Sequence, residues 1–171
     1  LAKYDVKATF FVTGSARLEY LPQIVAGGHS IGLHSVTHKY HEIYANEEAF
    51  FKDLYGIQSL VEQRIGYKTW LMRFPGGSSN KESAKHDGGI KIMSRLVKEV
   101  EKRGFHYFDW NVDSMDASSA HSPEQVFRNV VNGIGNKKHA VVLQHDTQPF
   151  SIQAVEKLIE LIRSNGDYIE K

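Results

Sequence analysis

Apolar residues along this chain fall into two patterns, short continuous runs and longer segments with helical spacing. The continuous runs predict buried strands at residues 7–13, 30–33, 69–74, 105–110 and 140–143, and Tyr168-Ile169 is a candidate start of a last strand. Helical spacing and glycine stops predict helices at residues 18–26, 47–65, about 90–103 and 151–163, with another beginning after Ser122. Apolar strands that alternate with helices indicate a parallel sheet covered by helices. Two architectures fit this pattern: an open doubly wound sheet and an incomplete (β/α) barrel.

Two helix starts carry capping residues. We expect Asn46 to cap the helix over 47–65, and Ser122 to cap the next predicted helix start, with Pro123 at its first position and Gln125 as capping-box partner. The apolar positions of the 47–65 helix should face the core: Phe50, Phe51, Leu54, Ile57, Val61 and Ile65.

Composition narrows the class of protein. The chain has 171 residues, 41% of them hydrophobic and 24% charged, which is typical of one globular domain. A net charge of +1 without a Lys/Arg cluster argues against a nucleic-acid partner. The absence of cysteine excludes disulfides and thiolate chemistry. No signal peptide or membrane-spanning apolar run is visible. Oligomeric state is left open.

Polar residues follow four of the predicted strands at their carboxyl ends, where parallel α/β folds gather their chemistry. His34 and His38 follow the second strand, Arg73 and Pro75-Gly76-Gly77 the third, Asp113 and Asp116 the fourth, and His145 the fifth. Each has a structural alternative: Arg73 as an ion-pair partner, the aspartates as turn residues, and His145 as a core histidine. Their convergence nevertheless predicts an active site.

The pair His34 and His38 is the best candidate for binding a metal. Residues four apart on a helical turn share one face, so both imidazoles could reach a single ion. Zinc would need a third protein ligand and an open position for catalysis, and another divalent transition metal is an alternative.

Four segments, in order, resemble the motifs of the polysaccharide deacetylases, carbohydrate esterase family four. His34-Ser35-Val36-Thr37-His38 looks like the His-Ser/Thr-x-x-His zinc motif, and Leu143-Gln144-His145 matches the Leu-x-His motif. Arg73-Phe74-Pro75-Gly76 resembles Arg-x-Pro-Tyr with Gly76 in place of the tyrosine. Asp113-Ser114-Met115-Asp116 resembles Asp-x-x-Asp-Trp, with Ala117 in place of the tryptophan.

The family's first motif, Thr-Phe-Asp-Asp-Gly, would lie before Leu1, and its aspartates supply the catalytic base and the third zinc ligand. The resemblance therefore implies that residues 1–171 are a single polysaccharide-deacetylase-like catalytic domain that is N-terminally incomplete. We expect an α/β fold, a distorted or incomplete (β/α) barrel with parallel strands whose first strand is missing. An exposed sheet edge would lower the stability of this chain.

The resemblance implies a zinc-dependent hydrolase that removes acetyl groups from N-acetylated amino sugars, above all the N-acetylglucosamine of bacterial peptidoglycan. An extracellular or cell-envelope location would follow from that substrate. The implied roles are zinc binding by His34 and His38, orientation of the base by Arg73, proton donation by His145 tuned by Asp116, and substrate binding by Gly76, Leu143 and Pro75.

Two other functions are compatible with parts of the pattern. The alternative is a non-catalytic carbohydrate-binding or scaffolding domain that keeps the deacetylase fold. A haem or non-haem iron protein is supported less well, because nothing beyond the histidine pair supplies iron chemistry.

Overall fold

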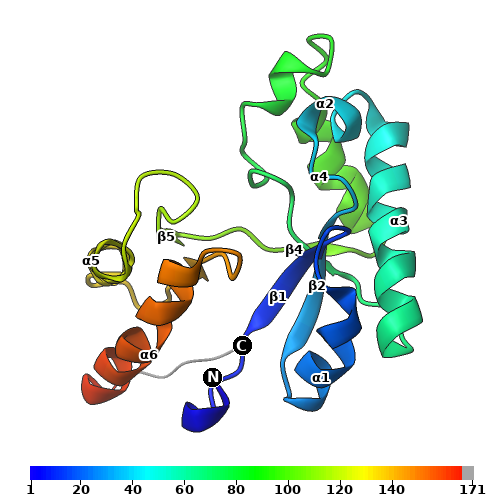
Figure 1. Ribbon diagram of the computed structural model, residues 1–171. Coiled ribbons are helices and arrows are strands. Elements are labelled where there is room, and N and C mark those ends of the chain that lie inside the picture. Colours follow the sequence, from blue (N-terminus) through cyan, green and yellow to red (C-terminus); the bar gives the residue numbers. More distant parts are fainter. Residues whose placement is uncertain (167–171) are drawn as a thin grey trace. The chain divides into compact units, whose positions relative to one another are not determined.

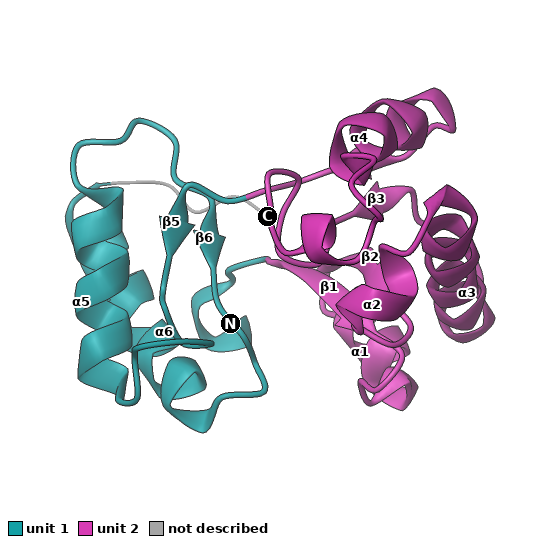
Figure 2. Cartoon of the chain, turned by 90° about the horizontal axis from the view of Figure 1, so that it is seen from above, with its two compact units in different colours: residues 1–7, 110–170 teal, residues 8–109, 171 magenta. Residues whose placement is uncertain are grey.

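The computed structural model describes residues 1–166, so the candidate strand at Tyr168-Ile169 lies outside the described residues. The chain divides into two compact units, shown in Figure 2. Unit 1 contains Leu1–Lys7 together with the described residues from Trp110 onward, and unit 2 contains Ala8–Asp109.

Unit 2 is built on a four-stranded parallel sheet with the strand order β1-β2-β3-β4. Its strands are β1 (Thr9–Thr13), β2 (Ser30–Ser35), β3 (Leu71–Met72) and β4 (His106–Tyr107) (Figure 1). The neighbouring strands β1 and β2 align Phe10 with Ile31 and Val12 with Leu33, which are apolar pairs. The parallel order places the ends of β2 and β3, with the residues that follow them, at the same edge of the sheet.

The helices of unit 2 are η2 (Leu18–Tyr20), α1 (Leu21–Ala26), α2 (Tyr40–Ile43), α3 (Glu47–Ile65), η3 (Ser83–Lys85) and α4 (Ile92–Lys102). The predicted cap of α3 is confirmed, because the Asn46 side chain accepts a hydrogen bond of 2.8 Å from the Ala49 N–H. The apolar face of α3 is buried from Phe50 to Val61, and Ile65 packs against the core partly buried. Helix α2 escapes prediction because it has only four residues.

Helix α4 begins at Ile92, two residues later than predicted. The Asp87 carboxylate accepts hydrogen bonds from the N–H groups of Gly89 (2.8 Å) and Ile92 (2.9 Å). Asp87 thus satisfies a donor of the first helical turn from five residues upstream, and Ile90 lies before the helix.

Unit 1 contains the parallel pair β5 (Val112–Asp113) and β6 (Val142–Leu143) with helices η1 (Ala2–Tyr4), α5 (Pro123–Ile134) and α6 (Pro149–Ser164). Ser122 caps α5 as predicted, accepting from the Gln125 N–H at 3.2 Å. The Gln125 side chain, however, accepts from the N–H of His121 rather than from that of Ser122. The core of this unit is separate from that of unit 2 and contains Val112, Ala120, Val126, Val130, Ala154 and Leu158.

The predicted α/β class with parallel strands is confirmed, and the strands of the described residues form two sheets rather than one closed barrel. The strand predicted at 105–110 is confirmed only at His106–Tyr107, as β4. The Phe108 N–H still donates to the Met72 carbonyl at 2.9 Å, but the carbonyls of Phe108 and Asp109 accept from the Arg73 guanidinium, and the strand goes no further. Pairing resumes at Val112, in a different sheet. No helix within residues 1–166 is long and apolar enough to cross a membrane.

Candidate active site

His34 and His38 do not share a helical turn, which corrects the geometry expected from their spacing. His34 lies in strand β2, and His38 follows in a turn with the left-handed φ of 55°. The turn folds the second imidazole back on the first, so that their Nε2 atoms lie 3.2 Å apart. A strand end followed by a tight turn therefore achieves the pairing that the i, i+4 spacing suggested.

The tautomer of His34 is the one that a metal-binding histidine needs when it binds through Nε2. Its Nδ1 lies 2.8 Å from the carbonyl oxygen of Arg73, and a carbonyl can only accept, so Nδ1 carries the hydrogen. Nε2 of neutral His34 then presents its lone pair toward His38. Metal-binding histidines are commonly oriented by such a bond from the other ring nitrogen.

The separation of the two Nε2 atoms also suits a shared ion. Two nitrogens at about 2.0–2.1 Å from one tetrahedral zinc ion are about 3.3 Å apart, close to the 3.2 Å between His34 and His38. The pair thus fits two positions of a metal centre. Within residues 1–166, no group of three His, Cys, Asp or Glu side chains is arranged to hold a metal.

The turn between the histidines is held by Asp53 of α3, a residue that sequence reasoning missed. Its carboxylate accepts from the N–H of Val36 with both oxygens at 3.1 Å and from the N–H of Thr37 at 3.3 Å. In addition, the Ser35 hydroxyl accepts from the His38 N–H at 2.9 Å. Four hydrogen bonds therefore fix the backbone between the two imidazoles.

Arg73 directly follows β3 and is only 8% exposed. Its Nε donates to the Phe108 carbonyl at 2.8 Å, its guanidinium lies 4.3 Å from the ring centre of Phe11, and burial lowers its pKa. The side chain is thus fixed on the sheet edge that carries His34. Its contact with His34 runs through its own backbone carbonyl.

The loop after Arg73 contains Pro75 and the exposed Gly76, with φ of 78°. The buried Tyr44 hydroxyl donates to the Pro75 carbonyl at 2.8 Å, which anchors the loop. A Cβ atom built on Gly76 would lie 2.6 Å from the hydroxyl oxygen of Tyr40. Gly76 therefore leaves room that the Tyr40 side chain fills.

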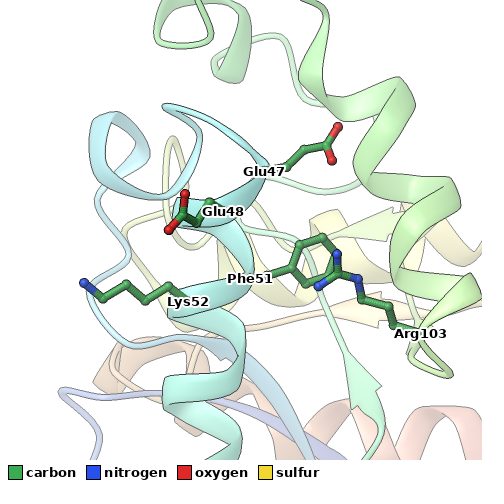
Figure 3. Close-up of a pocket in the computed structure, with 5 residues that line it drawn as sticks. All are labelled: Glu47, Glu48, Phe51, Lys52 and Arg103. Carbon is green, nitrogen blue, oxygen red and sulfur yellow. The ribbon is translucent and has the colours of Figure 1, made fainter.

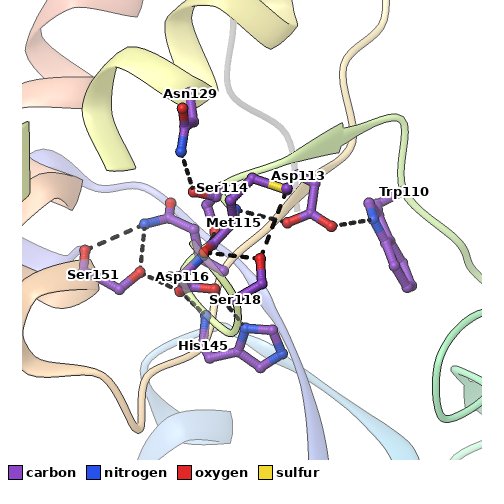
Figure 4. A network of polar contacts seen from close by, with 10 residues as sticks. Trp110, Asp113, Ser114, Met115, Asp116, Ser118, Asn129, His145 and Ser151 are labelled. Carbon is purple, nitrogen blue, oxygen red and sulfur yellow. Dashed lines mark hydrogen bonds and ion pairs between the residues drawn. The ribbon is translucent and has the colours of Figure 1, made fainter. Parts of the chain in front are cut away.

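In unit 1, Asp116 and His145 form the ion pair drawn in Figure 4. The Asp116 carboxylate is 2.7 Å from His145 Nδ1, and its second oxygen accepts from the His145 N–H at 2.7 Å. Ser151 of α6, which sequence reasoning also missed, donates to the same carboxylate at 2.5 Å. The Asp116 side chain is buried, whereas 40% of the His145 side chain is exposed.

The contacts of this pair determine its charges. Burial alone would raise the pKa of Asp116, but the hydrogen bonds from His145 and Ser151 outweigh it and lower that pKa to about 2. The hydrogen bond to Asp116 raises the pKa of His145. The buried carboxylate stays ionised, and the exposed side of the imidazole can offer a proton near neutral pH.

Asp113 and Leu143, which were also predicted for the site, lie on the paired strands of unit 1. The exposed Asp113 accepts from the Met115 N–H (2.8 Å) and from Trp110 Nε1 (3.2 Å), as a turn residue does. Leu143 pairs with Asp113 in the β5–β6 register and is half-buried, two residues before His145. The paired strands thus place Asp116 and His145 after neighbouring strand ends.

A separate pocket lies on unit 2, where Arg103 at the end of α4 covers Phe51 of α3 (Figure 3). Glu47, Glu48 and Lys52 complete its lining. None of the residues predicted for the active site lines this pocket.

Comparison with known proteins gives the same family as the motifs. The sequence profile described as "Polysaccharide deacetylase" matches residues 1–93. The crystal structure of the catalytic domain of peptidoglycan N-acetylglucosamine deacetylase from Eubacterium rectale ATCC 33656 is 43% identical, with a TM-score of 0.93, over 98% of this chain and 76% of that one.

Two curated relatives match 97% of the chain. The putative polysaccharide deacetylase YheN of Bacillus subtilis (strain 168) is 32% identical, and a peptidoglycan-N-acetylglucosamine deacetylase of Bacillus cereus is 31% identical. The chain spans 57% and 59% of the length of these two proteins. Since the profile covers more than half of the 171 residues, the chain belongs to the polysaccharide deacetylase family.

Proposed function

We propose that the protein is a zinc-dependent hydrolase that removes acetyl groups from N-acetylated amino sugars, with the N-acetylglucosamine of peptidoglycan as its substrate. The observation that carries this proposal is the histidine pair, whose Nε2 atoms are spaced for one ion and whose His34 tautomer is set by the Arg73 carbonyl. The names of the Bacillus cereus and Eubacterium rectale proteins support the choice of substrate.

His34 and His38 would hold the metal, and the family resemblance implies a carboxylate as the third ligand. When bound, zinc supplies a Lewis acid for the amide carbonyl and lowers the pKa of a water molecule. Arg73, held by the Phe108 carbonyl and the Phe11 ring, would orient the carboxylate that removes the proton from that water.

The remaining steps belong to the chain's own groups. The Gly76 N–H would donate to the oxygen that becomes negative, an interaction worth about 2.7–4 kcal/mol in other enzymes. His145, kept protonated by Asp116, would give its proton to the departing sugar amine. Leu143 would pack against the acetyl methyl group, and Pro75 would line the sugar site.

The proposal requires that residues from both units act on one substrate, so we propose that the two units together form a single catalytic domain. A polysaccharide substrate of the bacterial cell wall further implies a location in the cell envelope or outside the cell.

The test is zinc content and acetate release from N-acetylglucosamine oligomers, for the chain alone and with any residues that its gene encodes before Leu1. We expect the active form to contain one zinc ion, and His34→Ala and His38→Ala to lose both metal and activity. His121→Ala, which changes an exposed histidine of unit 1, is the control. Zinc-free, inactive protein that still binds the oligomers would instead establish the non-catalytic carbohydrate-binding function.

A further inference from the structure

Tyr40 brings a hydroxyl group to the candidate active site, beside Gly76, and this hydroxyl has no part in the function proposed above. It is the first residue of α2, two positions after His38, and the two rings meet edge to face with centroids 5.8 Å apart. On its other side the ring contacts Tyr44, at 5.6 Å between centroids. The ring therefore packs against the core of unit 2, and the packing fixes the direction of its hydroxyl.

That hydroxyl lies beside Gly76. It is 2.6 Å from the position of a Cβ atom on this exposed glycine, and ring atom Cε1 is 3.3 Å from the same position. The neighbouring Tyr44 hydroxyl is bonded to the Pro75 carbonyl. Among residues 1–166, by contrast, the Tyr40 hydroxyl has no hydrogen-bond partner.

A rigidly held hydroxyl at an exposed backbone position, next to a pair of imidazoles, is suited to a polar ligand. It can donate one hydrogen bond and accept another, which matches the hydroxyl and amide groups of an amino sugar. Specific binding sites commonly combine an apolar wall with a few placed polar groups of this kind.

We infer that Tyr40 is a substrate-binding residue, whose hydroxyl forms a hydrogen bond with the N-acetylated sugar bound beside His34, His38 and Gly76. This inference rests on the proposed function, since the N-acetylated sugar is the substrate named there. Tyr40 holds the sugar in the ground state and the transition state alike, so its hydroxyl contributes to affinity rather than to the chemical step.

The experiment measures the dissociation constant of an N-acetylglucosamine oligomer by calorimetry, with zinc and with chelator, for the wild type and Tyr40→Phe. Removing the hydroxyl should raise the dissociation constant about two- to tenfold, the range for one neutral hydrogen bond. In steady-state acetate release KM should rise by the same factor while kcat is kept. Tyr55→Phe, which removes an exposed hydroxyl from the outer part of α3, should change neither value.

A second variant, Gly76→Ala, tests the same hydroxyl by crowding it. Gly76→Ala would place a methyl group 2.6 Å from the Tyr40 oxygen and displace it, besides straining the backbone at φ of 78°. Gly76→Ala strains the backbone in the wild type and in Tyr40→Phe alike, but only the wild type has a Tyr40 oxygen to displace. The loss of affinity caused by Gly76→Ala should therefore be smaller in the Tyr40→Phe protein than in the wild type.

The outcomes separate the two proposals. A wild type that releases acetate while Tyr40→Phe keeps its affinity and KM would overturn the role of Tyr40 alone. A fall in kcat at constant KM, or strictly additive effects of the two substitutions, would also overturn it. A wild type that neither binds the oligomer nor releases acetate would overturn the proposed function and this inference together.

Discussion

The ring of His145, the proposed proton donor, is oriented by its contacts with Asp116. Its Nδ1 and its backbone N–H both face the Asp116 carboxylate, and the remaining part of the imidazole is exposed. Asp116 in turn is held by the Ser151 hydroxyl from α6. This arrangement fixes the ring orientation and favours the charged imidazole.

Substituting Asp116 tests that arrangement through the pH dependence of activity. The carboxylate raises the pKa of His145, so the imidazole remains protonated to higher pH than an ordinary histidine. Asp116→Asn removes the charge, and the pKa of His145 should fall. An acid with a lower pKa loses its proton at lower pH, and activity is lost with it. The high-pH limb of kcat/KM should therefore move to lower pH.

Asp113→Asn provides the graded control for this pH profile. Its carboxylate also raises the pKa of His145, but only through space and as a lesser cause than the Asp116 contacts. A smaller shift in the same direction is expected. An unchanged high-pH limb in Asp116→Asn would show that His145 is not the proton donor.

At the scale of elements, the end of β2 and the middle of α3 together make the histidine pair. Asp53 reaches from the helix to the N–H groups of Val36 and Thr37, which lie between the two imidazoles. Asp53→Asn keeps the size of the side chain but leaves a single acceptor oxygen. The turn should loosen, and zinc affinity should fall by about 10–100-fold, as for other residues that support metal ligands.

Competition with a zinc chelator measures this affinity, and Glu48→Gln is the matched control. Glu48 lies on the same helix, is exposed, and undergoes the same carboxylate-to-amide change. Its zinc affinity should equal that of the wild type. Equal affinities for wild type and Asp53→Asn would mean that the turn keeps its conformation without this carboxylate.

What the sequence can predict depends on which residues lie at the ends of neighbouring strands within each unit. The family resemblance implied that Asp116 tunes His145, and the structure brings the two together because each follows the end of a strand and β5 and β6 are neighbours in register. Arg73 likewise lies beside His34 because each is at or after the end of a strand and β2 and β3 are neighbours. The strand ends and the motifs therefore predicted these four residues, and the strand order explains why they meet in pairs.

The supporting residues could not be found in this way. Asp53, Tyr40 and Ser151 lie on helices, where an aspartate, a tyrosine and a serine have no distinctive pattern. Each acts on a segment that only tertiary structure brings near, such as Asp53 on a turn 16 or 17 residues away. The helical geometry expected for the histidine pair failed for a related reason, since spacing alone does not distinguish a helical turn from a strand followed by a tight turn.

At the scale of the whole molecule, the described residues contain two separate apolar cores, one in each unit. The two histidines proposed as zinc ligands belong to unit 2, and zinc that binds only the folded form stabilises it, by about 2.7 kcal/mol at a concentration of 100 times Kd. We therefore expect zinc to raise the unfolding midpoint of unit 2 more than that of unit 1.

The two tryptophans of the chain make this measurable, because Trp70 lies in unit 2 and Trp110 in unit 1. In Trp110→Phe, urea unfolding followed by fluorescence reports on Trp70, which packs at 5.0 Å from the buried Phe105 ring. In Trp70→Phe it reports on Trp110, whose Nε1 donates to Asp113.

Zinc should move the unfolding midpoint reported by Trp70 further than that reported by Trp110, and His34→Ala should abolish that difference. Midpoints that coincide with and without zinc would instead show that the two cores unfold as one cooperative structure, in which metal binding at the histidine pair stabilises both units equally.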